Sequence, residues 1–150
     1  MDSIYVNVTD TPVNPAFEIS QMQDRHMGAI SLFIGTVRDD HDENLIALHL
    51  EHYETMTQNK LFSIAQEAQK RWSLGQIRII HRFGRLTPED MIVLVAASSA
   101  HRSESLEAVH FIMDYLKTDA PFWKAEETSD GLKWVSARKS DDIAKDKWNS

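Results

Sequence analysis

Several short segments of the chain alternate apolar with polar residues, or consist of short apolar runs, as β-strands do. The alternation is clearest at 4–8, where the apolar residues recur with a period of two and so share one face of a strand. The other predicted strands are 29–37, 45–53, 76–82, 91–98, 122–126 and 133–136. Short polar turns separate them in pairs, which predicts antiparallel pairing.

The first predicted hairpin joins 29–37 to 45–53 across a polar turn at 38–43. Gly35 lies inside its first strand, where a glycine indicates a bulge or the close approach of another backbone. The second pair is 76–82 with 91–98, and the third surrounds Asp130-Gly131. Each pairing is a prediction from the turn sequence alone.

Two longer segments, 55–73 and 103–118, repeat apolar residues at helical spacing. Their apolar stripes are Leu61, Ala65, Ala68 and Trp72, and then Leu106, Val109, Met113 and Leu116. Thr55 and Gln58 fit a capping box at the start of the first helix, and Gly75 is placed to end it. Pro121 ends the second helix, because proline disfavours the helical conformation at the residue before it. Short helices are predicted at 17–23 and after residue 140, where the latter would hold Trp148.

Strands paired through short turns, with two amphipathic helices inserted, favour an α+β fold over the alternating order of a parallel sheet. We therefore expect a mainly antiparallel sheet with its two main helices on one side. The 150 residues contain no internal repeat, low-complexity tract or linker, so 1–150 is expected to form a single domain.

The composition excludes several classes of function. The chain has no cysteine, which rules out disulfides, thiolate metal sites and a cysteine nucleophile. A net charge of −7 opposes binding to nucleic acid or an anionic membrane, so an anionic ligand requires a local cluster of cations. No apolar run approaches the ~20 residues of a membrane span, and the N-terminus shows no secretory signal. We expect a cytoplasmic protein.

Known chemical motifs are few. The sequence has no glycine-rich phosphate loop, HExxH or GxSxG motif. His49, Glu51 and His52 suggest a metal site, but on a strand His52 points away from the other two. We therefore expect no metal site. The remaining histidines, including His81, are expected at the surface or as hydrogen-bonded core residues.

The segment SSAHRS, residues 98–103, lies where a strand is followed by a helix. Backbone N–H groups at a helix start favour an anion, and His101 and Arg102 add positive charge there. The segment is thus a candidate phosphate site. The alternative is that Ser103 only caps the helix while His101 and Arg102 are solvated. Arg38, alone at the end of a strand, carries little weight by itself.

The most informative stretch contains two lysines on either side of Pro121. Lys117 falls in the last turn of the predicted helix and Lys124 on the strand after the bend. Two ammonium groups brought together and partly desolvated by Phe122 lose protons more easily, so either can act as an acid, base or nucleophile. Glu126 shares the strand face of Lys124 and opposes this effect. The alternative is that Lys117 only complements the helix C-terminus.

These motifs together resemble the catalytic (large) subunit family of molybdopterin synthase. The resemblance is carried by GTVR (35–38), LEHY (50–53), SAHR (99–102), FIMDYLKTDAPFWK (111–124) and the segment 134–138. All five occur in the family's order, and the lysine-containing run and SAHR are the most specific. The similarity extends from about residue 29 to residue 148.

The resemblance implies an α/β hammerhead-type fold and a homodimer. It implies that each end of the dimer binds a small ubiquitin-like sulfur-carrier subunit, which gives a heterotetramer. The family converts cyclic pyranopterin monophosphate, a pterin phosphate substrate, to molybdopterin by inserting two sulfurs. The sulfur arrives as a thiocarboxylate on the carrier's C-terminal Gly-Gly tail, and neither a metal nor another cofactor is implied.

The resemblance also assigns residues by motif. Lys117 and Lys124 match the two active-site lysines, with Lys117 nearest the carrier's terminal glycine. The substrate-binding or pocket-lining positions, besides the lysines, are Thr36, Val37, Arg38, His101, Arg102, Ala125, Glu126 and Arg138. Phe33 and Met113 match apolar positions around the carrier tail and the pterin. Ala125 and Asp119 stand where relatives are often basic, which removes positive charge near the pocket.

Two other classes of function remain open from the residues. A non-catalytic module, either a scaffold for the carrier or a phosphate-binding regulatory domain, would share the SAHR segment but would not need both lysines. RNA binding on the sheet is disfavoured by the acidic charge and by the lack of a pair of basic and aromatic strands.

Overall fold

The computed structural model describes residues 3–39, 44–135 and 144–149. Its first sheet has the strand order β1 (Ile4–Thr9), β4 (Ile77–Arg82), β6 (Met91–Ser99) and β2 (Ala29–Thr36). β1 and β4 run parallel, whereas β6 is antiparallel to both β4 and β2. The central strand β6 is buried along most of its length, as its apolar run predicts.

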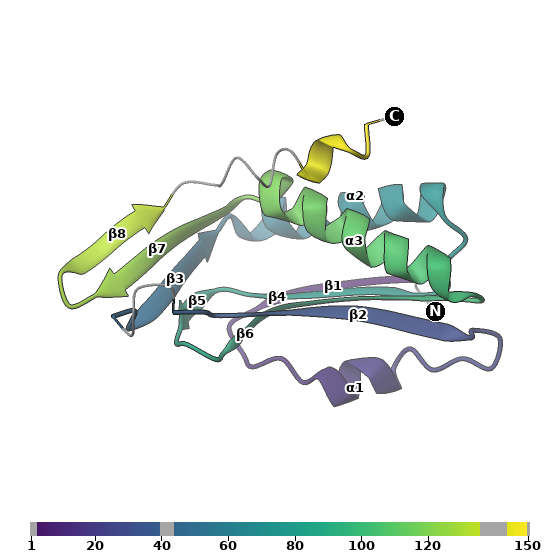
Figure 1. Ribbon diagram of the computed structural model, residues 1–150, viewed down its shortest axis with the longest axis horizontal. Helices are drawn as coiled ribbons and strands as arrows, with labels where there is room; N and C mark the ends of the chain where they lie inside the picture. The colour runs from purple at the N-terminus through teal and green to yellow at the C-terminus, as the bar shows by residue number, and fades with distance from the viewer. Residues whose placement is uncertain (1–2, 40–43, 136–143, 150) are drawn as a thin grey trace.

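The second sheet has the order β5 (Gly84–Leu86), β3 (Ala47–His52), β7 (Phe122–Thr128) and β8 (Gly131–Val135). All its neighbouring strands are antiparallel, and it extends from one end of the first sheet (Figure 1). The chain thus has the predicted α+β fold with mainly antiparallel strands.

The predicted hairpin of 29–37 with 45–53 is wrong. β2 pairs with β6, whereas β3 pairs with β5 and β7 in the other sheet. Leu48 and Leu50 of β3 pack against Val37 and Leu86, so burying them requires the second sheet. This burial outweighs the local turn signal, since a buried leucine contributes roughly 1.5–3 kcal/mol. The other two predicted strand pairs are confirmed.

The two long helices, α2 (Glu54–Arg71) and α3 (Arg102–Asp119), cover one face of the first sheet (Figure 1). The short helix α1 (Pro15–Ser20) lies on the opposite face, where Glu18 forms an ion pair with Arg78 at 2.6 Å. The main core fills the space between the long helices and the sheet, and includes Leu61, Ile64, Ile77, Ile79, Val93, Val95, Phe111 and Ile112. None of the helices in the described ranges is long and apolar enough to cross a membrane.

Both ends of α2 differ from the sequence prediction. Thr55 and Gln58 do not form a capping box. The N-cap is Tyr53, whose side chain makes no capping hydrogen bond, and Gln58 Nε2 instead donates to the Val6 carbonyl at 2.7 Å. The helix ends at Arg71, before Gly75. Tertiary contact with β1 therefore engages the side chain that the local motif had assigned to the helix start.

Three further predictions concern single residues. Leu106 is 56% exposed and does not belong to the buried face of α3. The predicted bulge at Gly35 is confirmed by a register shift between Gly35 and Thr36, and a Cβ on Gly35 would lie 2.9 Å from Val93 Cγ1. Trp148 is held near the C-terminus as expected, because its ring contacts Phe111 and its Nε1 donates to Asp114 at 2.7 Å.

Candidate active site

Lys117 and Lys124 lie on either side of the bend that ends α3. Lys117 is in the last helical turn, and Ala120 is extended with φ −72° and ψ 131°. Pro121 then leads into β7, which carries Lys124. The predicted helix end before Pro121 is confirmed. Lys117 is exposed and Lys124 is half-buried.

The face of β7 that carries Lys124 lies beside an apolar surface. Strand alternation puts Phe122, Lys124 and Glu126 on one face, as expected for Glu126. Their partners across the ladder are His52, Leu50 and Leu48 of β3. Both leucines are buried, so the aliphatic stem of Lys124 borders the core of the second sheet.

His81, near the end of β4, contacts the strand that carries Lys124 and lies within electrostatic range of Lys117. Its imidazole stacks on the Phe122 ring, with the centroids 3.8 Å apart and the planes at 18°. Its Nδ1 donates to the carbonyl of Arg82 at 2.8 Å, because a carbonyl oxygen only accepts, and this leaves Nε2 unprotonated.

The charge state of His81 follows from these surroundings. Burial lowers the pKa of His81 from 6.5 to about 4 against the opposing hydrogen bond to Arg82, and the nearby charges of Lys117 and His52 contribute in the same direction as burial. His81 is therefore neutral near pH 7, and the Lys117 ammonium lies within electrostatic range of it.

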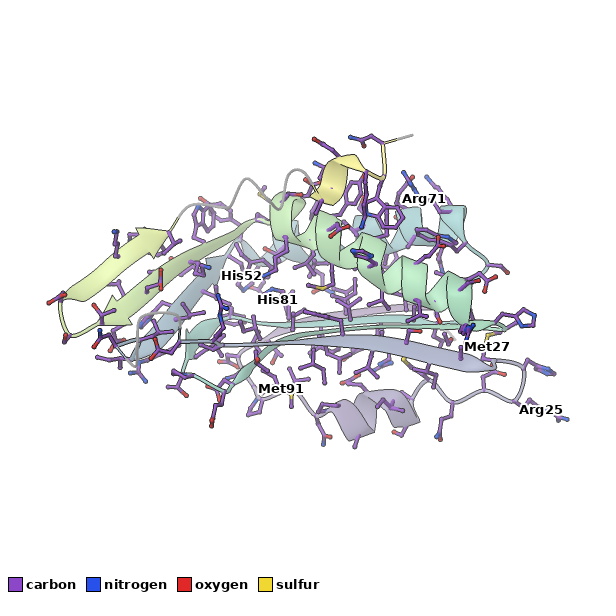
Figure 2. The ribbon with its side chains drawn as sticks, in the orientation of Figure 1. Arg25, Met27, His52, Arg71, His81 and Met91 are labelled. Atoms are coloured by element: carbon purple, nitrogen blue, oxygen red, sulfur yellow. The ribbon has the colours of Figure 1, made fainter. Side chains whose placement is uncertain are left out.

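His52 completes this group of rings. It lies 4.5 Å from Phe83 and 5.9 Å from Phe122, measured between ring centroids. Within the described part of the chain, its Nδ1 is buried and has no hydrogen-bond partner. Figure 2 shows His52 and His81 close together where the two sheets meet. A buried orphan nitrogen at such a place marks a site that a ligand or solvent can complete.

The GTVR segment lies at this same end of the first sheet. Thr36 ends β2 and pairs with Met91, the first residue of β6. Val37 is buried among the leucines of the second sheet, and Arg38 is exposed directly after it. Arg38 is thus on the lysine side of the molecule.

His101 and Arg102 lie at the other end of α3. His101 is the N-cap, and both side chains are exposed. Ser103 does not cap the helix, contrary to the alternative drawn from the sequence. The hydroxyl of the buried Ser99 donates to the His101 carbonyl and accepts from the Ser105 amide at 3.1 Å. Ser99 therefore fixes the turn that presents His101 and Arg102.

The two groups of candidate residues are far apart within one chain. At ~1.5 Å per residue, α3 separates Arg102 from Lys117 by about 22 Å. The β2–β6 ladder gives the same result: Ala29 pairs with Ser99 and Thr36 with Met91, about 23 Å apart at ~3.3 Å per residue. One chain therefore does not bring His101 and Arg102 to the lysines.

The apolar candidates differ in exposure. Phe33 is 41% exposed on the edge strand β2. It lies on the helix-covered side of the sheet, because Ser31, two residues earlier, shares a hydrogen bond of 2.7 Å with Ser105 of α3. Met113 is buried in the main core, one turn before Lys117.

The remaining candidates lie near the lysines or outside the described residues. Ala125 is buried on the face of β7 opposite to Lys124. Asp119 accepts from Lys145 Nζ at 2.7 Å and lies 3.9 Å from Lys60 Nζ, so nearby lysines balance its charge. Arg138 lies outside the described residues.

His49 and Glu51 are on the face of β3 opposite to His52, as the alternation predicts. His49 Nε2 is 2.6 Å from Glu127 Oε1, and hydrogen bonds from Arg85 and His49 hold the pKa of Glu127 below its usual value. Across 3–39, 44–135 and 144–149, no group of three or more metal-ligating side chains could hold a metal ion.

His81 and His52 were not identified as candidate site residues by the sequence analysis. His81 follows the apolar run of β4 and so resembles an ordinary core histidine, and its contact with Phe122 joins residues 41 positions apart. No local pattern encodes that contact. The LEHY motif contains His52, but only the pairing with β7 shows its position beside Phe122.

Comparison with known proteins identifies the family and the fold. The family described as MoaE protein matches residues 8–119. The molybdopterin synthase catalytic subunit of Escherichia coli is 52% identical over 122 residues, which cover 81% of each chain. The MoaE protein of Burkholderia ambifaria has a solved structure with a TM-score of 0.85 at 41% identity, covering 98% of this chain and 99% of that one. A Helicobacter pylori structure, described as a complex of subunits 1 and 2 of molybdopterin-converting factor, has the same fold, with a TM-score of 0.73 at 17% identity, covering 91% of this chain and 92% of that one.

Proposed function

The chain belongs to the MoaE family of molybdopterin synthase catalytic subunits, enzymes of molybdenum cofactor biosynthesis, and from this premise we propose that it inserts two sulfurs into cyclic pyranopterin monophosphate to form molybdopterin. The observation that carries the proposal is the placement of Lys117 and Lys124 around the Pro121 bend, beside the neutral, buried His81. A carrier scaffold or a regulatory phosphate-binding module would not need two amines there.

The sulfur comes from a small ubiquitin-like carrier with a C-terminal Gly-Gly thiocarboxylate. Its sulfur attacks an electrophilic carbon of the bound pterin and forms a thioester between the carrier and the pterin. Lys117 and Lys124 stabilise the oxyanions and move protons while the cyclic phosphate opens. Water then cleaves the thioester, which releases the carrier as a carboxylate and leaves the sulfur on the pterin. A second loaded carrier adds the other sulfur at the neighbouring carbon, whose oxygen leaves as water, and its thioester is hydrolysed in the same way; we expect the reaction to take place in the cytoplasm.

A small partner subunit is supported by the Helicobacter pylori structure, which its description gives as a complex of two subunits. In the proposed assembly, two copies of this chain form a homodimer and each end binds one carrier, which makes a heterotetramer. The carrier tail reaches Lys117 past Phe33 and Met113. Thr36, Val37, Ala125 and Glu126 line or flank the pterin pocket, and Arg38 and Arg138 add positive charge.

The homodimer also accounts for the separation along α3. His101 and Arg102 lie about 22 Å from Lys117 in their own chain, too far to hold a phosphate that the lysines reach. We infer that the partner copy supplies His101 and Arg102 to the lysine pocket. In a two-fold symmetric dimer, each of the two sites is then made from both chains.

The test combines in one dimer two variants that each give little turnover when the pterin is kept well below its wild-type KM, Lys117→Ala for lack of the amine and Arg102→Ala for weak binding of the phosphate. Lys117→Ala and Arg102→Ala chains are co-expressed with different tags, and mixed dimers are assayed with thiocarboxylated carrier and the pterin, with the oxidised fluorescent product as readout. Each mixed dimer, selected through its two tags, has one intact site of two, so about half of the wild-type turnover returns. Lys117→Ala mixed with Lys124→Ala is the matched control and recovers nothing, because each site then lacks a lysine.

Two outcomes contradict different parts of the proposal. Absence of product with the wild-type chain rejects the sulfur-insertion function itself. Wild-type turnover without recovery in the Lys117→Ala and Arg102→Ala mixture rejects the site shared between two chains and leaves the reaction in place.

A further inference from the structure

His81 interacts with both elements that carry the lysines, by ring stacking with β7 and electrostatically with α3. It is not part of the family motifs quoted above. It belongs to β4, a strand of the first sheet, whereas Phe122 and Lys124 belong to the second. Its imidazole is stacked face to face on Phe122, two residues before Lys124. Lys117, on α3, is close enough for its charge to act on the same imidazole.

We propose that His81 is a positioning residue that sets the place of Lys124 relative to Lys117 by stacking on Phe122 and holding it in place. The inference rests on the proposed function for its consequence in catalysis. Its structural part, the stacking of the imidazole on Phe122 within electrostatic range of Lys117, does not depend on the reaction.

The contact between His81 and Phe122 is made by residues whose backbone is held in regular secondary structure. His81 pairs with Val8 of β1 on one side and with Val93 of β6 on the other, so its backbone is fixed within the sheet. Only 5% of the residue is exposed. The ring orientation is fixed by the Nδ1 hydrogen bond to Arg82. A stacked ring held in this way holds Phe122 at the first position of β7, directly after the bend at Pro121.

The absence of charge matters because of what surrounds the ring. The titratable or charged groups that act on His81 are Lys117 of α3 and His52 of β3, while Arg82 contributes its backbone carbonyl and the packed face of β7 contributes the Phe122 ring. A protonated His81 would add a positive charge beside Lys117 and push its side chain away. The apolar ring contact and the burial prevent this near pH 7.

The experiment compares His81→Ala, which removes the ring, with His81→Phe, which keeps an uncharged ring of similar size. His26→Ala, at an exposed histidine, is the control. For His81→Ala we expect kcat to fall about 10–100-fold while KM for the pterin stays nearly unchanged, because a displacement of about 1 Å at a catalytic group has an effect of this size. His81→Phe restores kcat to within about threefold of wild type, since volume-conserving replacements are tolerated. Thermal unfolding of each variant establishes that it is folded.

A second readout does not depend on turnover. Lysine amines are labelled by reductive ¹³C-methylation, and the Lys117 signal is assigned with a Lys117→Arg variant. In the wild type this signal shifts as His81 gains its proton on acidification. The shift is lost in His81→Phe, where nothing titrates at that position.

The outcomes separate the two claims. Wild-type kcat in His81→Ala, or a His81→Phe variant as impaired as His81→Ala, overturns the positioning role. A Lys117 signal that titrates identically in the wild type and His81→Phe overturns the contact between the two residues. If the wild-type chain makes no product at all, the proposed function fails, and the labelling experiment still decides whether His81 acts on Lys117.

Discussion

At its C-terminal end, α3 carries the exposed Lys117 near the junction of two sheets, where the neutral, buried His81 stacks on Phe122. At its N-terminal end, the same helix presents His101 and Arg102 from an exposed turn that is held by the hydroxyl of Ser99. The first end suits proton transfer, because an amine within reach of a reacting group can donate or accept a proton. The second suits the binding of an anion, because a guanidinium keeps its charge at any ordinary pH. In the proposed mechanism, chemistry and anchoring are therefore divided between two ends of one helix, and a second copy of the chain joins them.

The largest expected effect tests the lysine end. Replacing Lys117 with Ala removes the amine closest to the reacting groups, and turnover should fall by about 10²–10⁴-fold, the usual contribution of a general acid or base. Carrier binding, measured by calorimetry, stays nearly unchanged, because one side chain of a broad interface is lost. Lys70→Ala, at an exposed lysine of α2, is the control and keeps full activity. Wild-type turnover in Lys117→Ala would remove Lys117 from the mechanism.

The lysine end also predicts a pH dependence of stability. The pKa of His81 is lowered from 6.5 to about 4 in the folded chain, so the unfolded chain binds more protons between these values. The free energy of unfolding therefore falls as the pH drops below about 6.5, by up to about 3 kcal/mol once the pH is below 4. Urea unfolding at several pH values from 7 to 4 measures this. In His81→Phe that part of the pH dependence disappears, and an unchanged slope would contradict a buried, neutral His81.

Whether the sequence predicts a feature of this fold depends on whether the contacts behind it are local in the chain or join distant residues. Most strand and helix segments, the bend at Pro121 and the bulge at Gly35 come from local patterns, and the structure confirms them, whereas the short strand β5 was not predicted. The predicted pairing of β3 with β2 was wrong. Leu48 and Leu50 are buried by the second sheet, whose strand pairing no short turn encodes. The capping box of Thr55 failed for the same reason, since Gln58 contacts β1 instead.

The candidate site divides in the same way. The lysines were found from their position around a proline, which is a local feature. His81 joins them through Phe122, a contact between two sheets that the sequence could not indicate. The distance between the lysines and Arg102 is also a property of the folded helix and strands, so only the structure shows that these residues lie about 22 Å apart in one chain.

The anchoring end gives a smaller effect of a different kind. In Arg102→Ala we expect KM for the pterin to rise about 10–100-fold, since a hydrogen-bonded ion pair with a phosphate contributes about 1.5–3 kcal/mol. The value of kcat changes little, because the guanidinium binds the ground state and the transition state alike. Steady-state kinetics separate the two parameters, with the exposed Arg25→Ala as the control. A fall in kcat at unchanged KM would assign Arg102 to the chemistry instead.

The smallest effect separates two serines at the start of α3. Ser99 is fully buried and its hydroxyl accepts from the Ser105 amide, whereas Ser103 is exposed and is not the N-cap. Ser99→Ala leaves that amide and the turn unsatisfied, so the free energy of unfolding should drop by about 1–2 kcal/mol, as for the loss of a helix cap. Ser103→Ala changes it by less than about 0.5 kcal/mol, the usual range for a surface position. Urea unfolding of the two variants measures both values. Ser99 also fixes the carbonyl of His101, so we expect only the Ser99 variant to bind the pterin more weakly. Equal losses of stability in both variants would show that the turn is held by the helix start itself, and the anchoring end would then depend on α3 alone.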